Sequence, residues 1–224
     1  MRDCDDLLLN KWLALLQKQG DIQTIFDVGA NIGQTSKLFR SKLPEAIVYA
    51  FEPSASAFDN LKSSMSNDFN VNVFPIALGE RDGSVELYEN SCDVTNSLLP
   101  NAERMFQFAP SEMCMPEKKS TAELMRLDSF CEKESIKKID LLKVDAQGYE
   151  RYILEGAGSF FDPKKIRGLM LEILFVDLYE GQTWGGELFE ILRLHGYRLF
   201  GFISVESNDV QGWKWADALF IADD

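Results

Sequence analysis

The chain has 224 residues and a formal net charge of −13, with 46% hydrophobic and 26% charged residues. This length and composition are typical of one globular domain that buries a sizeable core, so we expect a single domain over residues 1–224. The acidic balance argues against nucleic acid as a partner, because binding phosphates requires a basic face. It disfavours an anionic membrane surface for the same reason.

The four cysteines and the single histidine are too scattered to predict a zinc site. We expect free thiols in a reducing compartment and therefore a cytoplasmic protein. The first residues are acidic and unlike a signal peptide, and no apolar run approaches the ~20 residues that a membrane helix needs.

Apolar periodicity, glycines and capping residues predict alternating strands and helices along the chain. The expected helices span 7–19, 31–43, 54–65, a short segment capped by Asp128, 149–156 and 186–195. The expected strands span 25–28, 46–51, 71–74, 76–79, 83–88, 120–127, 138–145, 168–174, 197–202 and 215–221.

Several connections carry topological information. The turn 207–212 contains no helix, so the last two strands should be antiparallel. The strands 76–79 and 83–88 read as a hairpin around 80–82. The helix within residues 1–20 should cover either the sheet edge or the entrance to a cofactor site.

The segment 90–119 interrupts this alternation. It is polar at first, and Met105, Phe106, Phe108, Met113 and Met115 then appear among prolines. Long loops inside compact domains are usually functional or disordered. The segment is therefore either a surface loop or a lid over a substrate, for which methionine and phenylalanine make an adaptable apolar wall.

The stretch from Ile25 to Thr35 predicts a ligand-binding turn. Three apolar residues surround Asp27 and run into Gly29 and Gly33, and a helical pattern starts at Ile32. Ligands of open α/β sheets bind beyond the carboxyl ends of the strands, where helix N–H groups are free. Glu52, followed by Pro53, ends the next strand and could accept both hydroxyls of a ribose. The alternative is a turn without a ligand.

The turn lacks the motifs that bind dinucleotides and phosphates, and this absence narrows the choice of ligand. A dinucleotide fingerprint would need glycines where Asn31 and Gln34 stand, and no phosphate-binding loop is present. Asp27 would repel phosphates and suit the cationic S-adenosylmethionine, with Asp27 near its amino group and Glu52 on its ribose. The expected cofactor-binding residues are Asp27, Gly29, Asn31, Gly33, Glu52, Pro53 and Asp145.

Three motifs together resemble the FkbM-type methyltransferase family. They are the run from Asp27 to Gly33, the triplet from Phe51 to Pro53, and the run from Leu142 to Glu150. The resemblance implies an S-adenosylmethionine-dependent methyltransferase that usually acts on an oxygen of a small molecule, sugar or natural product. It also implies a Rossmann-like fold, with a mostly parallel seven-stranded sheet that includes one antiparallel strand and has helices on both faces. Neither the acceptor nor the oligomeric state follows from it.

The third motif contains the candidate catalytic residues. Lys143 and Asp145 lie two apart in what should be the central, fully apolar strand, so they point to the same side. Asp145 is the first candidate for the base that removes the acceptor proton, and Glu172 is the second. Glu172 could also pair with Lys143, and Glu150 could hold the loop through a backbone N–H. The alternative is a structural ion pair, since buried charges require partners.

Other readings remain open. His195 precedes Gly196 at a helix end and reads as a helix C-terminal residue rather than a base. Catechol-type methyltransferases use Mg²⁺, but no second and third ligand beside Asp145 has convincing spacing, so we expect no metal. A catalytically inert nucleoside-binding or scaffold protein of the same fold is the main alternative. An NAD-dependent oxidoreductase is less favoured, because two fingerprint glycines are missing.

Overall fold

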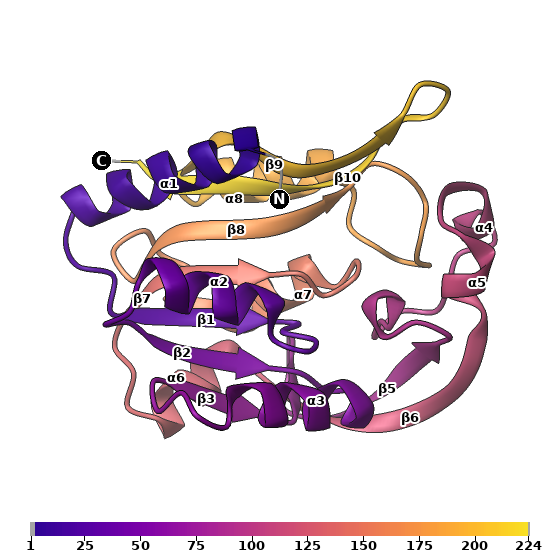
Figure 1. Ribbon diagram of the computed structural model, residues 1–224, viewed down its shortest axis with the longest axis horizontal. Helices are drawn as coiled ribbons and strands as arrows, with labels where there is room; N and C mark the ends of the chain where they lie inside the picture. Colours follow the sequence, from indigo (N-terminus) through magenta and orange to yellow (C-terminus); the bar gives the residue numbers. More distant parts are fainter. Residues whose placement is uncertain (1–2, 224) are drawn as a thin grey trace.

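A seven-stranded sheet forms the centre of the computed structural model, which describes residues 3–223 (Figure 1). In spatial order its strands are β3 (Val71–Phe74), β2 (Ile47–Phe51), β1 (Thr24–Val28), β7 (Ile139–Val144), β8 (Ile166–Leu174), β10 (Gly212–Ala222) and β9 (Tyr197–Asn208). Only β10 runs against its neighbours in this sheet. The expected sheet, with its single antiparallel strand, is confirmed.

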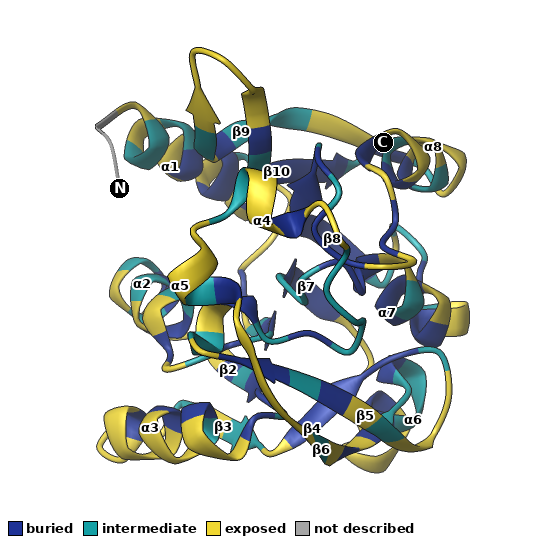
Figure 2. Ribbon diagram, turned by 90° about the vertical axis from the view of Figure 1, so that its right-hand side faces the viewer, coloured by how far each residue is buried: buried dark blue, intermediate teal, exposed yellow. Residues whose placement is uncertain are grey.

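Helices cover both faces of this sheet, which explains why every residue of β7 and β8 is buried (Figure 2). One face carries α1 (Asp3–Lys18), α2 (Gln34–Lys42) and α3 (Ala55–Met65). The other carries α6 (Leu127–Lys133), α7 (Glu150–Ala157) and α8 (Gly185–Leu194). The core is correspondingly divided into two large clusters, one on each side.

The first helix lies over the sheet edge, one of its two expected places. The Trp12 side chain is fully buried, and its Nε1 donates to the carbonyl of Phe220 in β10 at 3.0 Å. Leu8 packs against Gly201 in β9, the edge strand. The helix therefore covers the sheet at its β9 edge, which is the edge farthest from β3.

The expected hairpin at 76–88 is wrong. β4 (Ile76–Leu78) and β5 (Gly83–Asn90) do not pair with each other, because β6 (Pro116–Met125) lies between them in a three-stranded sheet. Asp82 turns the connection toward β6, since its Oδ1 accepts from the Arg126 N–H at 2.8 Å. Its Oδ2 accepts from the Ser129 hydroxyl, also at 2.8 Å.

Two helix starts also differ from expectation. The helix α6 begins at Leu127, and Asp128 lies inside its first turn, where its carboxylate pairs with Arg126 at 2.6 Å. The helix α2 begins at Gln34 rather than at residue 31. Asn31 and Gly33 have φ values of 49° and 91°, which a right-handed helix cannot include.

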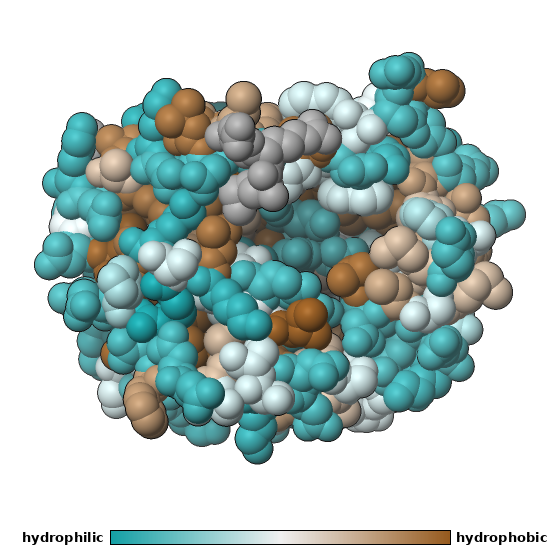
Figure 3. Space-filling model, in the orientation of Figure 1, coloured by the Kyte–Doolittle hydropathy of each residue, from teal (hydrophilic) through white to brown (hydrophobic). Residues whose placement is uncertain are grey.

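The segment 90–119 contains three short helices and the start of β6. They are η1 (Asp93–Thr95), α4 (Met105–Phe108) and α5 (Ser111–Cys114), and Figure 2 shows α4 and α5 in front of the carboxyl edge of the sheet. Across residues 3–223, no helix combines the length and apolar character needed to cross a membrane. The four cysteines are free, as expected. Figure 3 shows a mostly hydrophilic face with a hollow near its middle.

Candidate functional site

Four charged residues form a row across adjacent strands on one face of the sheet. Asp27 in β1 is the register partner of Lys143 in β7, and Glu172 in β8 is the partner of Asp217 in β10. Lys143 is in register with Met170, two residues before Glu172, so all four side chains lie on the same face. Buried charges require partners, so the contacts of these four side chains determine how the row is stabilised.

Lys143 is paired with Asp27 rather than with Glu172, which corrects the expected partner. Its Nζ lies 3.0 Å from Asp27 Oδ1 and donates to the Gly29 carbonyl at 2.8 Å. Burial alone would lower the pKa of Lys143, but the carboxylates of Asp27 and Asp145 overcome this and raise it. The reason for the different partner is the register, which places Asp27 directly beside Lys143.

Asp27 lies below the ligand turn and has no exposed surface. Its second oxygen, Oδ2, accepts a hydrogen bond from the Ser36 hydroxyl of α2 at 2.6 Å. The carboxylate thus joins the sheet to the helix that follows the turn. Its partners are Lys143 and Ser36, and it does not line the cavity above them.

A cavity of about 290 Å³, hereafter the cofactor cavity, lies above the turn. Of the expected cofactor-binding residues, Gly29, Asn31, Glu52, Pro53 and Asp145 line it. Gly29 has a φ of 70°, and a Cβ there would collide with the carbonyl of Asp145, so this position requires glycine.

Gly33 has another role than the expected one. It does not line the cofactor cavity, and a Cβ on it would collide with Met65 and Leu61 of α3. This glycine therefore allows α2 and α3 to approach each other. The packing positions the turn that carries Asn31.

Glu52 fixes the rim of the cofactor cavity through two backbone contacts. Its Oε2 accepts from the N–H of Asn31, and its Oε1 accepts from the N–H of Ser54, both at 2.9 Å. Burial raises the pKa of Glu52 to about 7, and these two hydrogen bonds only partly offset that effect. Each carboxylate oxygen retains a further lone pair that can face a ligand.

A second cavity, of about 240 Å³ and hereafter the acceptor cavity, adjoins the first. Three residues, Val94, Asp145 and Gln147, line both cavities. Met105 and Met113 of the segment 90–119 form part of the second wall. The role of this segment as a lid remains a prediction, and two of its apolar side chains, Phe106 and Met115, are exposed instead.

Gln147 connects the candidate catalytic carboxylates, although sequence reasoning gave it no role. Its Nε2 donates to Asp145 Oδ1 and to Glu172 Oε2, each at 2.8 Å. Its Oε1 accepts from the Tyr179 hydroxyl at 2.7 Å. Its φ of 53° is unusual for a residue with a side chain. The only sequence signal for Gln147 was its place inside the third motif.

Burial raises the pKa of three carboxyl groups in this part of the molecule. Burial, followed by the charge of Asp145, raises the pKa of Glu172 well above its usual value. Burial likewise raises the pKa of Asp217 to about 7 and that of Glu150 to about 7. Glu150 holds the loop as expected, because its Oε1 accepts from the N–H groups of Ala146 and Gly148 at 3.0 and 3.2 Å.

His195 lies at the end of α8, as expected for a helix C-terminal residue. Its Nδ1 lies 2.8 Å from the carbonyl of Ile191, and its ring stacks on Phe161 at 4.3 Å between centroids. It lines neither cavity. Within residues 3–223, no group of three or more His, Cys, Asp or Glu side chains is arranged to hold a metal ion.

Comparisons with known proteins agree with this arrangement. A family model described as the methyltransferase FkbM domain matches residues 27–199. Methyltransferase 1 of Beauveria bassiana (strain ARSEF 2860) is 30% identical over 146 residues, which are 61% of this chain and 59% of the relative. The 31-O-demethyl-FK506 methyltransferase FkbM of Streptomyces tacrolimicus is 26% identical over 208 residues, or 80% of this chain and 74% of the relative.

The fold is also similar to solved structures. The methyltransferase FkbM from Methylobacillus flagellatus KT has a TM-score of 0.52 and 14% identity, over 89% of this chain and 43% of the other. This likeness concerns the fold alone. The chain spans less than two thirds of the length of the Beauveria bassiana relative and of this solved chain.

Proposed function

The chain belongs to the FkbM methyltransferase family, and on this premise we propose that it is an S-adenosylmethionine-dependent O-methyltransferase acting on a hydroxylated small molecule. The observation that carries the proposal is the meeting of two cavities at Asp145 and Gln147. A methyl donor in one and an acceptor in the other would approach each other at a carboxylate. The name of the Streptomyces tacrolimicus relative, a 31-O-demethyl-FK506 methyltransferase, supports methylation at a hydroxyl.

The cofactor cavity fits S-adenosylmethionine in its donor set. Glu52 is placed to accept from ribose hydroxyls, while the apolar side chains of Phe51, Ile76 and Leu78 offer a wall for a base. Lys143 also lines this cavity, but Asp27 already neutralises its charge, so it offers little to a pyrophosphate. When bound, S-adenosylmethionine supplies an activated methyl group on a sulfonium.

The residues of this chain would act mainly by alignment. Holding the acceptor oxygen in line with the methyl group can supply an effective molarity of about 10⁵–10⁸ M. Gln147 orients Asp145 through its Nε2, and Tyr179 fixes the amide in turn. Gln147 thereby holds Oδ1 of Asp145, and Oδ2, which lies 3.8 Å from Lys143 Nζ, would take the proton of the acceptor hydroxyl.

Asp145 is a better candidate for the base than Glu172. It lines both cavities, whereas Glu172 lines only the acceptor cavity. Burial and the neighbouring charge of Asp145 raise the pKa of Glu172 well above its usual value, and its Oε2 already accepts from Gln147 Nε2. We therefore assign proton removal to Asp145 and positioning of the acceptor to Glu172. In this scheme the oxygen–methyl bond forms, the sulfur–methyl bond breaks, and Asp145 holds the released proton.

The test is methyl transfer from labelled S-adenosylmethionine to a library of hydroxylated metabolites. We expect Asp145→Asn to fold and to bind S-adenosylhomocysteine like the wild type, while kcat falls by about 10²–10⁴, the range for lost general-base help. Glu172→Gln is the matched variant, and its kcat should fall by less than that of Asp145→Asn. Full turnover by Asp145→Asn beside an inactive Glu172→Gln would reverse the two roles. Binding without turnover on any acceptor would favour an inert nucleoside-binding protein.

A further inference from the structure

The wall of the acceptor cavity is mostly apolar. Seven apolar side chains from three separate parts of the chain line it: Val94, Met105, Ala109, Pro110, Met113, Leu178 and Trp215. Such a wall stabilises a ligand by removing apolar surface from water and not by specific hydrogen bonds. The body of the acceptor should therefore be apolar over most of its surface.

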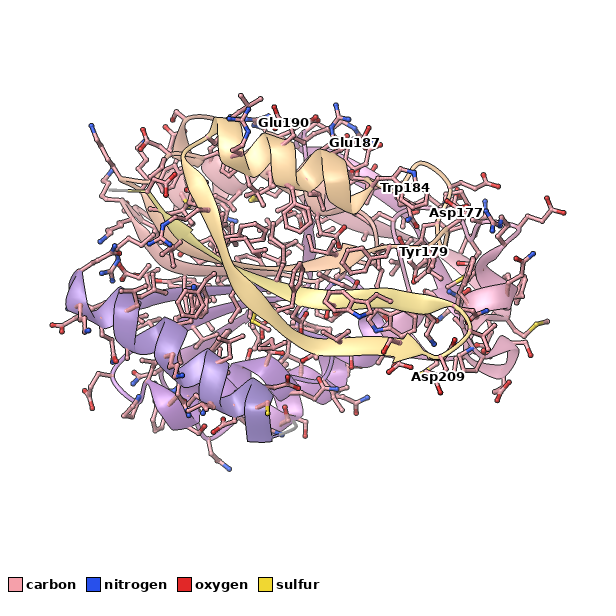
Figure 4. The ribbon with its side chains drawn as sticks, turned by 90° about the horizontal axis from the view of Figure 1, so that it is seen from above. Asp177, Tyr179, Trp184, Glu187, Glu190 and Asp209 are labelled. Carbon is pink, nitrogen blue, oxygen red and sulfur yellow. The ribbon has the colours of Figure 1, made fainter. Side chains whose placement is uncertain are left out.

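The polar groups in this wall are already engaged within the protein. The Thr95 hydroxyl donates to the carbonyls of Cys92 and Met113 at 2.9 and 2.8 Å. The Tyr179 hydroxyl donates to Gln147 Oε1, and Figure 4 shows Tyr179 lying inside the molecule beside the last two strands. A polyhydroxylated ligand would find few free partners here, and each buried hydroxyl left unpaired weakens binding.

The charge in this wall has one sign. Among the described residues that line it, the charged side chains are Asp145 and Glu172, and none is Lys, Arg or His. Lys143, which lines the adjoining cofactor cavity, and Lys214, which precedes Trp215 in the chain, are otherwise engaged. Lys143 pairs with Asp27, while the Nζ of Lys214 lies 3.3 Å from Glu206 and donates to the Phe108 carbonyl at 3.2 Å.

An anionic acceptor would thus bring a second negative charge beside Asp145, where the ammonium of Lys143, 3.8 Å from Asp145 Oδ2, already balances Asp27 at 3.0 Å. Buried like charges repel strongly, and the net charge of −13 on the whole chain adds to this effect. From the apolar wall, the engaged hydroxyls and the missing cation, we infer that the methyl acceptor is an uncharged, largely apolar alcohol or phenol. The inference predicts that sugar acids and phosphorylated metabolites are not acceptors. This inference rests on the proposed function, because it assumes that the acceptor cavity holds the substrate.

The test is a binding comparison on three probes that differ at one position. Methyl 6-hydroxy-2-naphthoate and 6-hydroxy-2-naphthamide are neutral, and 6-hydroxy-2-naphthoic acid is anionic at pH 7.5. With S-adenosylhomocysteine present, we expect both neutral probes to bind the full chain at least about tenfold more tightly than the acid, a difference of about 1.4 kcal/mol. Equal or tighter binding of the acid overturns the inference. So does an amide as weak as the acid, or no saturable binding of either neutral probe.

A substitution that adds a charge to the wall of the acceptor cavity provides a second test. Val94 lines the cavity and is 43% exposed, so Val94→Arg adds a cation without burying one. It should reduce the preference for the ester over the acid by at least about threefold, since it supplies the missing counterion. Phe69→Arg, at a residue that is 98% exposed and lines neither cavity, is the matched control and should leave the preference unchanged. An unchanged preference in Val94→Arg contradicts the charge argument.

The two hypotheses fail in different ways. Neutral probes that bind more tightly than the acid but are never methylated would count against the proposed function and support only the preference of the cavity for uncharged ligands. Methyl transfer that favours the acid would support the proposed function and overturn the inference.

Discussion

Replacing Lys143 with methionine should destabilise the protein strongly, because it removes the cation that is paired with Asp27. The ammonium group lies 3.0 Å from Asp27 Oδ1, and both side chains are at most 4% exposed. After the change, Asp27 would keep one hydrogen bond, from Ser36, and its Oδ1 would face an apolar side chain. Removing one partner of a buried pair costs about 3–5 kcal/mol. For a chain of this size, that corresponds to a melting temperature lower by roughly 6–20 °C.

Thermal melting followed by circular dichroism measures this effect. Lys137→Met, at an exposed residue just before β7, is the matched control and should stay within about 0.5 kcal/mol of the wild type. The double variant Asp27→Asn with Lys143→Met should recover part of the loss, since it leaves no unpaired charge. A Lys143→Met protein that melts within 2 °C of the wild type, or a double variant as unstable as the sum of both singles, would refute the pairing.

Two further predictions concern ligands. The pKa of Glu52 is raised to about 7, so the carboxyl becomes neutral as pH falls through 7 and accepts weaker hydrogen bonds from ribose. The dissociation constant of S-adenosylhomocysteine should therefore rise by up to about tenfold between pH 8 and pH 6, and calorimetry should show a flat profile for Glu52→Gln. If the dissociation constant changed equally with pH in the wild type and in Glu52→Gln, a group other than Glu52 would be responsible for the pH dependence. Methyl transfer should survive dialysis against a strong chelator, and activity restored only by Mg²⁺ would establish a metal-assisted mechanism.

Local sequence patterns predicted the main sheet well, because each of its strands carries its own signal. β7 and β8 are apolar runs, and the helix-free turn before β10 implies its antiparallel direction. The error at β4 and β5 has a different origin. Their partner β6 begins almost thirty residues after β5 ends, and only tertiary pairing shows that it lies between them.

The sequence predicted those parts of the candidate site whose residues lie within a single motif. The contacts of Glu150 and the place of Glu52 followed from residues close in sequence. The pairing of Lys143 with Asp27 did not, because strand order and register decide it. The acceptor cavity could not be predicted from the sequence for the same reason, because Tyr179 and Trp215 line it from segments that are distant in the chain.

The central claim is that the cavity beneath Glu52 binds a nucleoside bearing a sulfonium methyl donor, and a calorimetric titration tests it most directly. S-adenosylhomocysteine and NAD should be titrated in parallel into the wild type and Glu52→Ala. The account predicts saturable one-to-one binding of S-adenosylhomocysteine to the wild type, severe weakening in Glu52→Ala, and much weaker binding of NAD. Tighter binding of NAD than of S-adenosylhomocysteine would contradict it.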